Sequence, residues 1–280
     1  MQERLDIGFG IGNIVSTSRD VKIIEDLELQ VIKLTEENYR LEKLLNARRQ
    51  FIRLVTHELK SPIAAVENYL KLILQGYINL EDQDKILEKC IIRTCEERQL
   101  IDDLLDLGRI EESESLPITP VHLDQVLQSV LSECQDDVID KNLQLTLEIG
   151  EDIPEIQAVP ELSKSIWCNL VSNALKYTPD NGEISIGLQA RDKALIGWIR
   201  DSGIGISTED QKKIFREFFR GENAKNTSIA GTGLGLVLVK KIVEGLGGEI
   251  SFESELGVGS TFQFMIPTGN GSRISESIVG

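Results

Sequence analysis

Residues 24–55 read IEDLELQVIKLTEENYRLEKLLNARRQFIRLV, and the spacing of apolar residues in this stretch decides the first part of the fold. Spacings of three and four alternate, as on the a and d sites of a heptad. The a sites hold Ile24, Val31, Asn38, Leu45 and Ile52, and the d sites hold Leu27, Leu34, Leu41, Arg48 and Val55. Apolar a and d residues over several heptads predict a coiled coil.

Two positions of this seam are polar. Asn38 at an a site costs stability but can fix a parallel two-stranded register. Arg48 at a d site predicts local splaying of the seam. The pattern therefore favours a dimer of parallel helices over the alternative, a single long helix packed on its own domain.

The helical pattern extends beyond the seam and then repeats. It continues to Leu74, where Gly76 supplies a stop. Residues 77–81 read as a turn, and a second helix is expected over 82–112. Two such hairpins from two chains would bury their apolar stripes as a four-helix bundle.

The character of the sequence changes after residues 111–120, which are acidic, contain Ser and Pro, and show no apolar period. Helices are expected at 122–140, 161–176 and 236–246, and strands at 143–149, 183–189, 194–200, 249–253 and 260–266. Helices and mostly antiparallel strands in this mixture predict a two-layer α/β sandwich.

Composition restricts the classes of function. The formal net charge is −16, with 41% hydrophobic and 27% charged residues, so the chain is of globular type and would be repelled by nucleic acid and by anionic membrane surfaces. The four cysteines show no paired metal spacing and read as reduced cytosolic thiols. No apolar run approaches the roughly 20 residues of a membrane helix. We therefore expect a cytoplasmic location, or the soluble part of a larger or membrane-attached protein whose anchor lies outside this sequence.

His57 is the first candidate catalytic residue. It occupies an f site, which faces away from the seam, so an exposed imidazole could meet a bulky nucleotide. The carboxylate of Glu58 could accept a proton from one ring nitrogen, which leaves the other a better nucleophile. Pro62 lies inside the same helix, where proline costs roughly 3 kcal/mol and predicts a kink. A chance surface histidine is the alternative interpretation of the His-Glu pair alone.

Residues 169–177, NLVSNALKY, are the first of three segments that indicate a nucleotide site. Asn169, Asn173, Lys176 and Tyr177 recur at helical spacing and share one helix face. Amide oxygens suit Mg²⁺, and Lys176 supplies positive charge for phosphate. An ordinary polar helix end is the alternative, which the two asparagines disfavour because Asn is a poor helix former.

Residues 201–206, DSGIGI, form the second segment, directly after a predicted strand. The Asp201 carboxylate can accept a hydrogen bond from the amino group of adenine, whereas guanine presents a carbonyl there. Gly203 and Gly205, with Ile206 after them, would let the backbone approach the base closely. Such a turn is only moderately specific when taken alone.

The third segment leads into a predicted helix and consists of Gly231, Thr232, Gly233, Leu234, Gly235 and Leu236. Glycine-rich backbone at a helix N-terminus can hold phosphate through its N–H groups. A tight loop or a dinucleotide-type turn is the alternative. No lysine of the P-loop type follows, and residues 226–230 do not read as a strand, which disfavours the P-loop and Rossmann folds.

Taken in order, these motifs resemble those of sensor histidine kinases of two-component systems. Residues 57–62, HELKSP, resemble the H-box of the dimerisation and histidine phosphotransfer domain. The resemblance implies that His57 is phosphorylated with help from Glu58, and that Lys60 lies near the γ-phosphate. Residue 61 is more often Thr or Asn in relatives that also dephosphorylate their partner, so Ser61 leaves phosphatase activity open.

The other segments resemble the N-, G1- and G2-boxes of the Bergerat-fold ATP-binding domain, and residues 214–220 resemble its F-box, with Phe215 and Arg220. The resemblance implies that Asn173 ligates Mg²⁺ and that Asn169 neighbours the phosphates. It further implies that Lys176 contacts phosphate, Tyr177 flanks the nucleoside, Asp201 reads adenine, and residues 207–230 form a lid.

The resemblance implies a domain order, a cofactor pair and partners. We expect a leader or remnant of an upstream sensor (1–20), a coiled-coil signalling helix (21–50), a dimerisation and phosphotransfer hairpin (51–113), a linker (114–120), a catalytic ATP-binding domain (121–268) and a tail (269–280). The cofactors would be ATP and Mg²⁺. The partners would be a second copy bound through residues 21–113 and the receiver domain of a response regulator.

Asn169 separates this sequence from gyrase-like and chaperone-like ATPases, which carry a glutamate at that position. An amide cannot take a proton from water, so ATP hydrolysis should be slow. The rival interpretations are a hydrolysing ATPase and a dimeric scaffold that holds nucleotide without catalysis. The acidic run Asp102, Asp103 and Asp106 is expected to be a solvated helix face, with a partner surface as the alternative.

Overall fold

The structure, a computed structural model, describes residues 18–111, 116–223 and 231–268. Residues 1–17 of the predicted leader (1–20), 112–115 at the junction of the predicted hairpin and linker, 224–230 of the predicted lid and the tail 269–280 lie outside the described residues. The chain divides into two compact units, residues 1–61 and 62–280. Among the helices described, none is long and apolar enough to cross a membrane.

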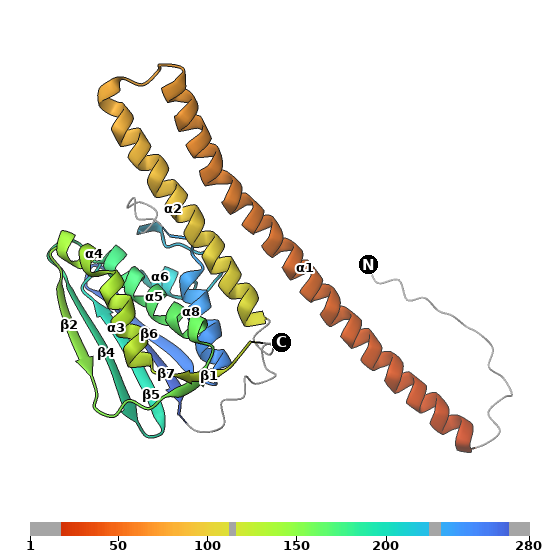
Figure 1. The fold of residues 1–280 in the computed structure, drawn as a ribbon. Helices are drawn as coiled ribbons and strands as arrows, with labels where there is room; N and C mark the ends of the chain where they lie inside the picture. Colours follow the sequence, from red (N-terminus) through yellow and green to blue (C-terminus); the bar gives the residue numbers. More distant parts are fainter. Residues whose placement is uncertain (1–17, 112–115, 224–230, 269–280) are drawn as a thin grey trace. The chain divides into compact units, whose positions relative to one another are not determined.

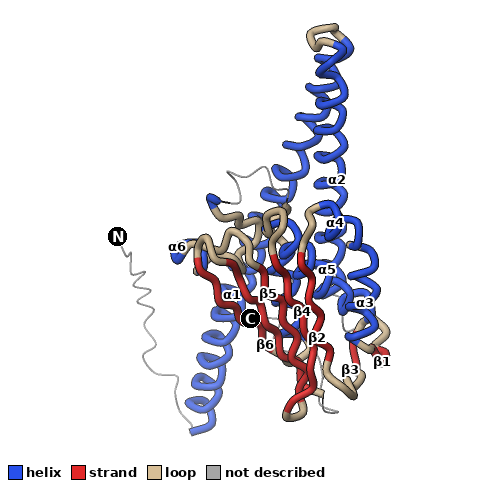
Figure 2. Tube along the Cα trace, turned by 90° about the vertical axis from the view of Figure 1, so that its left-hand side faces the viewer, coloured by secondary structure: helices blue, strands red, loops and turns tan. Residues whose placement is uncertain are grey.

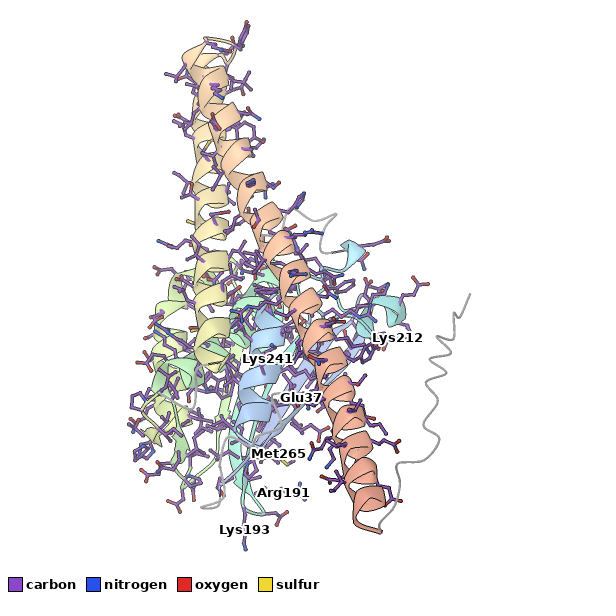
Figure 3. The ribbon with its side chains drawn as sticks, turned by 90° about the vertical axis from the view of Figure 1, so that its right-hand side faces the viewer. Glu37, Arg191, Lys193, Lys212, Lys241 and Met265 are labelled. Carbon is purple, nitrogen blue, oxygen red and sulfur yellow. The ribbon has the colours of Figure 1, made fainter. Side chains whose placement is uncertain are left out.

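The first unit is the N-terminal part of helix α1 (Ser18–Leu74), as the heptad predicted. Its seam is open to solvent in the single chain: Val31 is 61% exposed and Leu34 59%. Glu37, labelled in Figure 3, is an exposed residue of this helix. The predicted kink at Pro62, where one unit meets the next, stays a prediction.

The second unit begins with a helical hairpin. Helix α1 ends at Leu74, and Gly76 follows with φ 71°. The N–H of Gly76 donates to the carbonyl of Ile73, and the N–H of Tyr77 donates to the carbonyl of Leu72. This pair of bonds is a Schellman motif, in which glycine adopts the left-handed conformation without strain. Helix α2 (Leu80–Glu111) then runs close to its predicted bounds.

A five-stranded sheet forms the second half of this unit, in the order β2-β4-β5-β7-β6. Its strands are β2 (Gln144–Ile149), β4 (Glu183–Arg191), β5 (Ala194–Asp201), β6 (Glu249–Glu255) and β7 (Gly259–Pro267). β2 and β4 are parallel, and the other pairs are antiparallel. The turn between β4 and β5 has Asp192 and Lys193 at positive φ, and Lys193 lies at its tip (Figure 3).

Helices cover one face of this sheet, as Figures 1 and 2 show. They are α3 (Leu123–Glu133), α5 (Pro160–Tyr177) and α8 (Gly235–Gly245). The buried Trp167 of α5 meets Phe264 of β7 edge-on at 5.0 Å, and its Nε1 donates to the carbonyl of Leu123 at 3.1 Å. The predicted two-layer α/β sandwich is confirmed.

Two local predictions were wrong, and one short helix was missed. Thr119 and Pro120, assigned to the linker, belong to strand β1 (Thr119–Val121), which pairs with β3 (Ile156–Ala158). The helix predicted over 122–140 breaks at Cys134, where ψ is 9°, into α3 and α4 (Gln135–Asp140). A short helix, α6 (Thr208–Gln211), follows β5 and was not predicted; Ser207 caps it by accepting from the N–H of Asp210.

Candidate functional site

His57 lies on α1 with 77% of its side chain exposed, as the f site of the heptad predicted. Its Nδ1 is 3.2 Å from Oε1 of Glu58. Within the described part of the chain, Nε2 has no hydrogen-bond partner. Lys60 and Ser61 are exposed on the next turn of the same helix. The imidazole therefore presents Nε2 to solvent while Glu58 is placed to hold a proton on Nδ1.

A cavity of about 300 Å³ in the second unit collects the three predicted nucleotide segments. The predicted residues that line it are Asn169, Asn173, Lys176, Tyr177, Asp201, Gly205, Ile206, Arg220, Gly231, Thr232, Gly233, Gly235 and Leu236. Its size and mixed polar and apolar lining suit a small organic ligand.

Three predicted binding residues do not line this cavity. Leu234 is fully buried in the core. Phe215 turns instead to Phe252, with 5.8 Å between the ring centroids. Gly203 acts through its backbone, since its N–H donates to Oδ1 of Asp201 at 2.8 Å. Sequence motifs name whole segments, and the helix and strand geometry decides which side chain of a segment faces the ligand.

Asn169 is held between two elements. Its Nδ2 donates to the carbonyl of Ser165 at 2.9 Å. A Cβ placed on Gly235 would come within 2.4 Å of the Asn169 Oδ1, so the start of α8 can approach this amide only because residue 235 is glycine. The amide oxygen is thus fixed where α5 meets the glycine-rich segment.

Lys141 fastens the C-terminal end of α5. Its Nζ donates to the carbonyls of Leu175 at 2.6 Å and Thr178 at 3.1 Å. A cation at this end of a helix also interacts favourably with the helix dipole. The end of α5 carries Lys176 and Tyr177, both in the cavity wall, where burial lowers the pKa of Lys176 and raises that of Tyr177.

Asp201 sits at the end of β5 with its carboxylate partly withdrawn from water. Burial raises its pKa, while the backbone N–H groups of Gly203 and Ser260 act in the opposite direction by stabilising the charged form. The N–H of Ile204 donates to the carbonyl of Tyr177 at 3.2 Å, which ties this loop to α5. The carboxylate is a preformed acceptor for a ligand amino group.

The glycine-rich segment is tied to the F-box segment. Gly233 has φ 72°, and its carbonyl accepts from the N–H of Phe218 at 3.0 Å. A Cβ on Gly233 would fall 2.7 Å from the Phe218 carbonyl carbon. Glycine is therefore required at this position both by the positive φ and by the close approach of the Phe218 backbone. The Thr232 hydroxyl accepts from the N–H of Leu234, and α8 begins at Gly235. An anion could be bound at the start of this helix.

The prediction that Asp103 is part of a solvated face was wrong. This residue of α2 is only 3% exposed and lines the cavity together with Gln99. It accepts from the Thr232 hydroxyl at 2.5 Å and from Nε2 of Gln99 at 2.9 Å. Burial raises its pKa, whereas these hydrogen bonds and Lys176 lower it. The signal was available: Leu100, Asp103, Leu107 and Ile110 recur at helical spacing.

The donor set fits Mg²⁺ bound with a nucleotide. Asn173 places a side-chain amide in the cavity beside Lys176 and the glycine-rich backbone. No cluster of three or more His, Cys, Asp or Glu side chains suited to a metal occurs among the described residues. Mg²⁺ commonly keeps waters and takes few protein ligands plus substrate phosphates. One amide oxygen is consistent with that mode of binding.

A helical hairpin with an exposed histidine, followed by this sandwich and cavity, defines a phospho-acceptor region joined to an ATPase domain. The family model for the "His Kinase A (phospho-acceptor) domain" matches residues 47–113, and that for the "Histidine kinase-, DNA gyrase B-, and HSP90-like ATPase" matches residues 159–270. The chain belongs to the sensor histidine kinases of two-component systems.

Two curated relatives illustrate this similarity. The signal transduction histidine-protein kinase BarA of Escherichia coli (strain K12) is 33% identical over 263 residues, which are 91% of this chain and 28% of that protein. The sensor-like histidine kinase SenX3 of Mycobacterium bovis is 31% identical over 222 residues, 79% of this chain and 54% of that protein. The chain thus spans between about a quarter and about half the length of these relatives.

Solved structures share the fold. The histidine kinase AdeS of Acinetobacter baumannii superposes with a TM-score of 0.61 at 24% identity, covering 76% of this chain and 98% of that one. Histidine kinase ThkA, solved in complex with the response regulator protein TrrA, gives a TM-score of 0.59 at 23% identity, covering 87% of this chain and 68% of that one.

Proposed function

We propose that the protein transfers the γ-phosphate of ATP to its own His57 and then passes it to an aspartate of a response regulator. The observation that carries the proposal is the single cavity lined by the three motif segments. The exposed His57, with Glu58 on its Nδ1, supplies the matching acceptor.

His57 provides the nucleophile. Nε2 attacks the γ-phosphorus as the bond to the β,γ-bridging oxygen breaks, and ADP leaves. Glu58 holds the Nδ1 proton and stabilises the positive charge that develops on the ring. Lys60, one turn along the same helix face, would meet the γ-phosphate oxygens.

The cavity residues provide binding and orientation. Asp201 accepts from the adenine amino group, and Tyr177 flanks the nucleoside. Lys176 and the N–H groups of residues 231–235 receive the phosphates, and Asn173 would hold Mg²⁺. When bound, Mg²⁺ offsets negative charge on the phosphates.

Asn169 favours phosphotransfer to the histidine over hydrolysis. Its Nδ2 is engaged by the Ser165 carbonyl, and an amide oxygen is too weak a base to take a proton from water. Bound ATP would therefore persist until His57 reaches it. The exposed Ser61 hydroxyl could orient water, which would permit phosphatase activity in addition to phosphotransfer.

The proposed partners follow from the same architecture. The open seam of α1 would pair with a second copy through residues 21–113, and a receiver domain would bind near His57. The complex of ThkA with TrrA is a precedent in a protein of the same fold. An upstream sensor would lie outside this sequence, and the location would be cytoplasmic.

Radiolabelled ATP tests the proposal. With [γ-³²P]ATP and Mg²⁺, the wild type should become labelled and His57→Ala should not. His122→Ala is a matched control, because His122 is the other histidine and its side chain is 45% exposed. Equal labelling of wild type and His57→Ala would refute the assignment. Phosphate release much faster than labelling would favour a hydrolysing ATPase, and ATP binding without labelling would favour a scaffold.

A further inference from the structure

Helix α2 carries a buried stripe that faces the ATPase domain. Leu100, Asp103, Leu107 and Ile110 are each 3–6% exposed and recur at spacings of three and four, so they form one helix face. This face contacts α5 and α8, the two helices that bear the N-box and follow the G2-box. The helix is therefore docked on the elements that build the nucleotide cavity.

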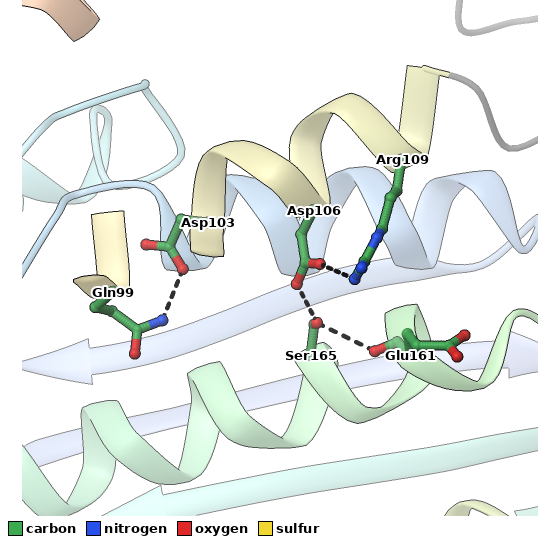
Figure 4. Close-up of polar contacts among 6 residues, drawn as sticks. All are labelled: Gln99, Asp103, Asp106, Arg109, Glu161 and Ser165. Carbon is green, nitrogen blue, oxygen red and sulfur yellow. Dashed lines mark hydrogen bonds and ion pairs between the residues drawn. The ribbon is translucent and has the colours of Figure 1, made fainter. Parts of the chain in front are cut away.

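Two carboxylates form the polar part of this docking face, and Figure 4 shows them one turn apart. Asp106 accepts from the Ser165 hydroxyl of α5 at 2.5 Å and from Arg109 of its own helix at 3.1 Å. Asp103 accepts from Gln99 of its own helix and from the Thr232 hydroxyl. Asp106 thus anchors α2 outside the cavity, whereas Asp103 enters the cavity wall.

The Asp103 carboxylate lies at the groups that are proposed to bind the phosphates. Asp103 accepts from the Thr232 hydroxyl, in the glycine-rich segment whose N–H groups would receive the phosphates, and it interacts with the ammonium of Lys176, a proposed phosphate contact. An ionised carboxylate and a nucleotide triphosphate at the same few donors repel each other, and the repulsion is strong where little water screens it. The docked carboxylate is an internal substitute for phosphate.

We propose that Asp103 is an autoinhibitory latch, through which docking of α2 on the ATPase domain and binding of nucleotide phosphates oppose each other. The latch rests on the proposed ATP site. By linkage, the coupling is reciprocal: docked α2 weakens ATP binding, and ATP weakens the docking of α2 by the same factor. Phosphate binding would then release the helix that belongs to the phospho-acceptor hairpin.

Removing the charge of Asp103 while keeping its shape tests the latch. Isothermal titration calorimetry should show that Asp103→Asn binds ATP about fivefold more tightly than wild type, a typical allosteric coupling. Adenosine, which lacks phosphates, should bind the two proteins equally. Asp102→Asn is the matched control, because Asp102 is the exposed neighbour on the same helix and its substitution removes the same charge.

The outcomes separate the latch from the ATP site. ATP binding that is equal in wild type, Asp103→Asn and Asp102→Asn overturns the latch alone, as does an equal gain for adenosine. Weaker ATP binding by Asp103→Asn would make Asp103 a ligand-binding residue and would also overturn it. If none of the three proteins binds ATP, the proposed site fails and the latch fails with it.

Hydrogen exchange gives an independent measurement on the unaltered protein. Addition of ATP with Mg²⁺ should increase deuterium uptake of the α2 peptide containing residues 99–110, because the helix loses its packing on α5 and α8. Adenosine should leave this uptake unchanged. Protection of the peptide by ATP would contradict the latch.

Discussion

Asp201 is a carboxylate that the fold keeps partly out of water. Its pKa is raised by burial, so the ionised form is less favourable in the folded state than in the unfolded state. Such a group lowers stability at neutral pH, and the proposed contact with adenine supplies a functional reason for its presence.

Asp201→Asn should therefore stabilise the ATPase unit while weakening ATP binding, because the proposed acceptor for the adenine amino group is lost. At neutral pH we expect the thermal midpoint to rise by about 2–4 °C. The gain should be complete above the raised folded-state pKa of Asp201, and should vanish below its ordinary value of 3.8, where the carboxyl is protonated in both states. Calorimetric scans from pH 3 to 8 and ATP titrations measure the two effects.

Asp192→Asn supplies the control for this change. The Asp192 side chain is 91% exposed at the β4–β5 turn, and Asn tolerates its positive φ. Its thermal midpoint and ATP affinity should match those of wild type. An Asp201→Asn protein that binds ATP normally would remove Asp201 from the adenine site.

At the scale of the elements, α5 is positioned by a residue that no motif includes. Lys141 donates to the carbonyls of Leu175 and Thr178 at the end of the helix that presents Lys176 and Tyr177. Lys141→Met removes a charged donor from these carbonyls. We expect a loss of about 1–2 kcal/mol in the free energy of unfolding, together with weaker ATP binding, because two cavity residues lose their support.

Chemical denaturation and ATP titration of the same samples measure both effects. Lys89→Met is the control, since Lys89 is an exposed lysine of α2 and its loss should change neither quantity. An unchanged unfolding free energy in Lys141→Met would show that the end of α5 needs no support from this ammonium.

The elements also show what the sequence could and could not predict. Long periodic segments such as α1, α2 and α5 were predicted close to their bounds, because apolar spacing and a Gly76 stop are local signals. The short β1–β3 pair depends on contacts between distant segments. Thirteen residues predicted from the motifs line one cavity. Asp103 also lines this cavity, because α2 docks on the ATPase domain, and the run of charged residues around Asp103 did not indicate that contact.

At the scale of the whole molecule, the described chain exposes apolar surface that a second copy could cover. On α1, Leu41 is 51% exposed and Ile52 54%; on α2, Ile91 is 64% exposed and Leu105 57%. Surface of this extent, arranged in helical stripes, usually marks an interface. The stripe on α2 lies beside the face that docks on α5 and α8, so one helix can serve both contacts.

Asn38 gives the sharpest test of how the copies pair. A buried Asn at an a site lowers the stability of a coiled coil but selects two parallel strands in register, because its partner in the other chain is then the matching Asn. The Asn38→Val protein should therefore associate with itself more tightly, but no longer in one register and one oligomeric state. Light scattering coupled to size exclusion should then detect species larger than a dimer. Glu36→Ala, at the outward f site of the preceding heptad, should remain a dimer. A single dimeric species for Asn38→Val would mean that the pairing is fixed by the hairpin of α1 and α2 and not by the seam.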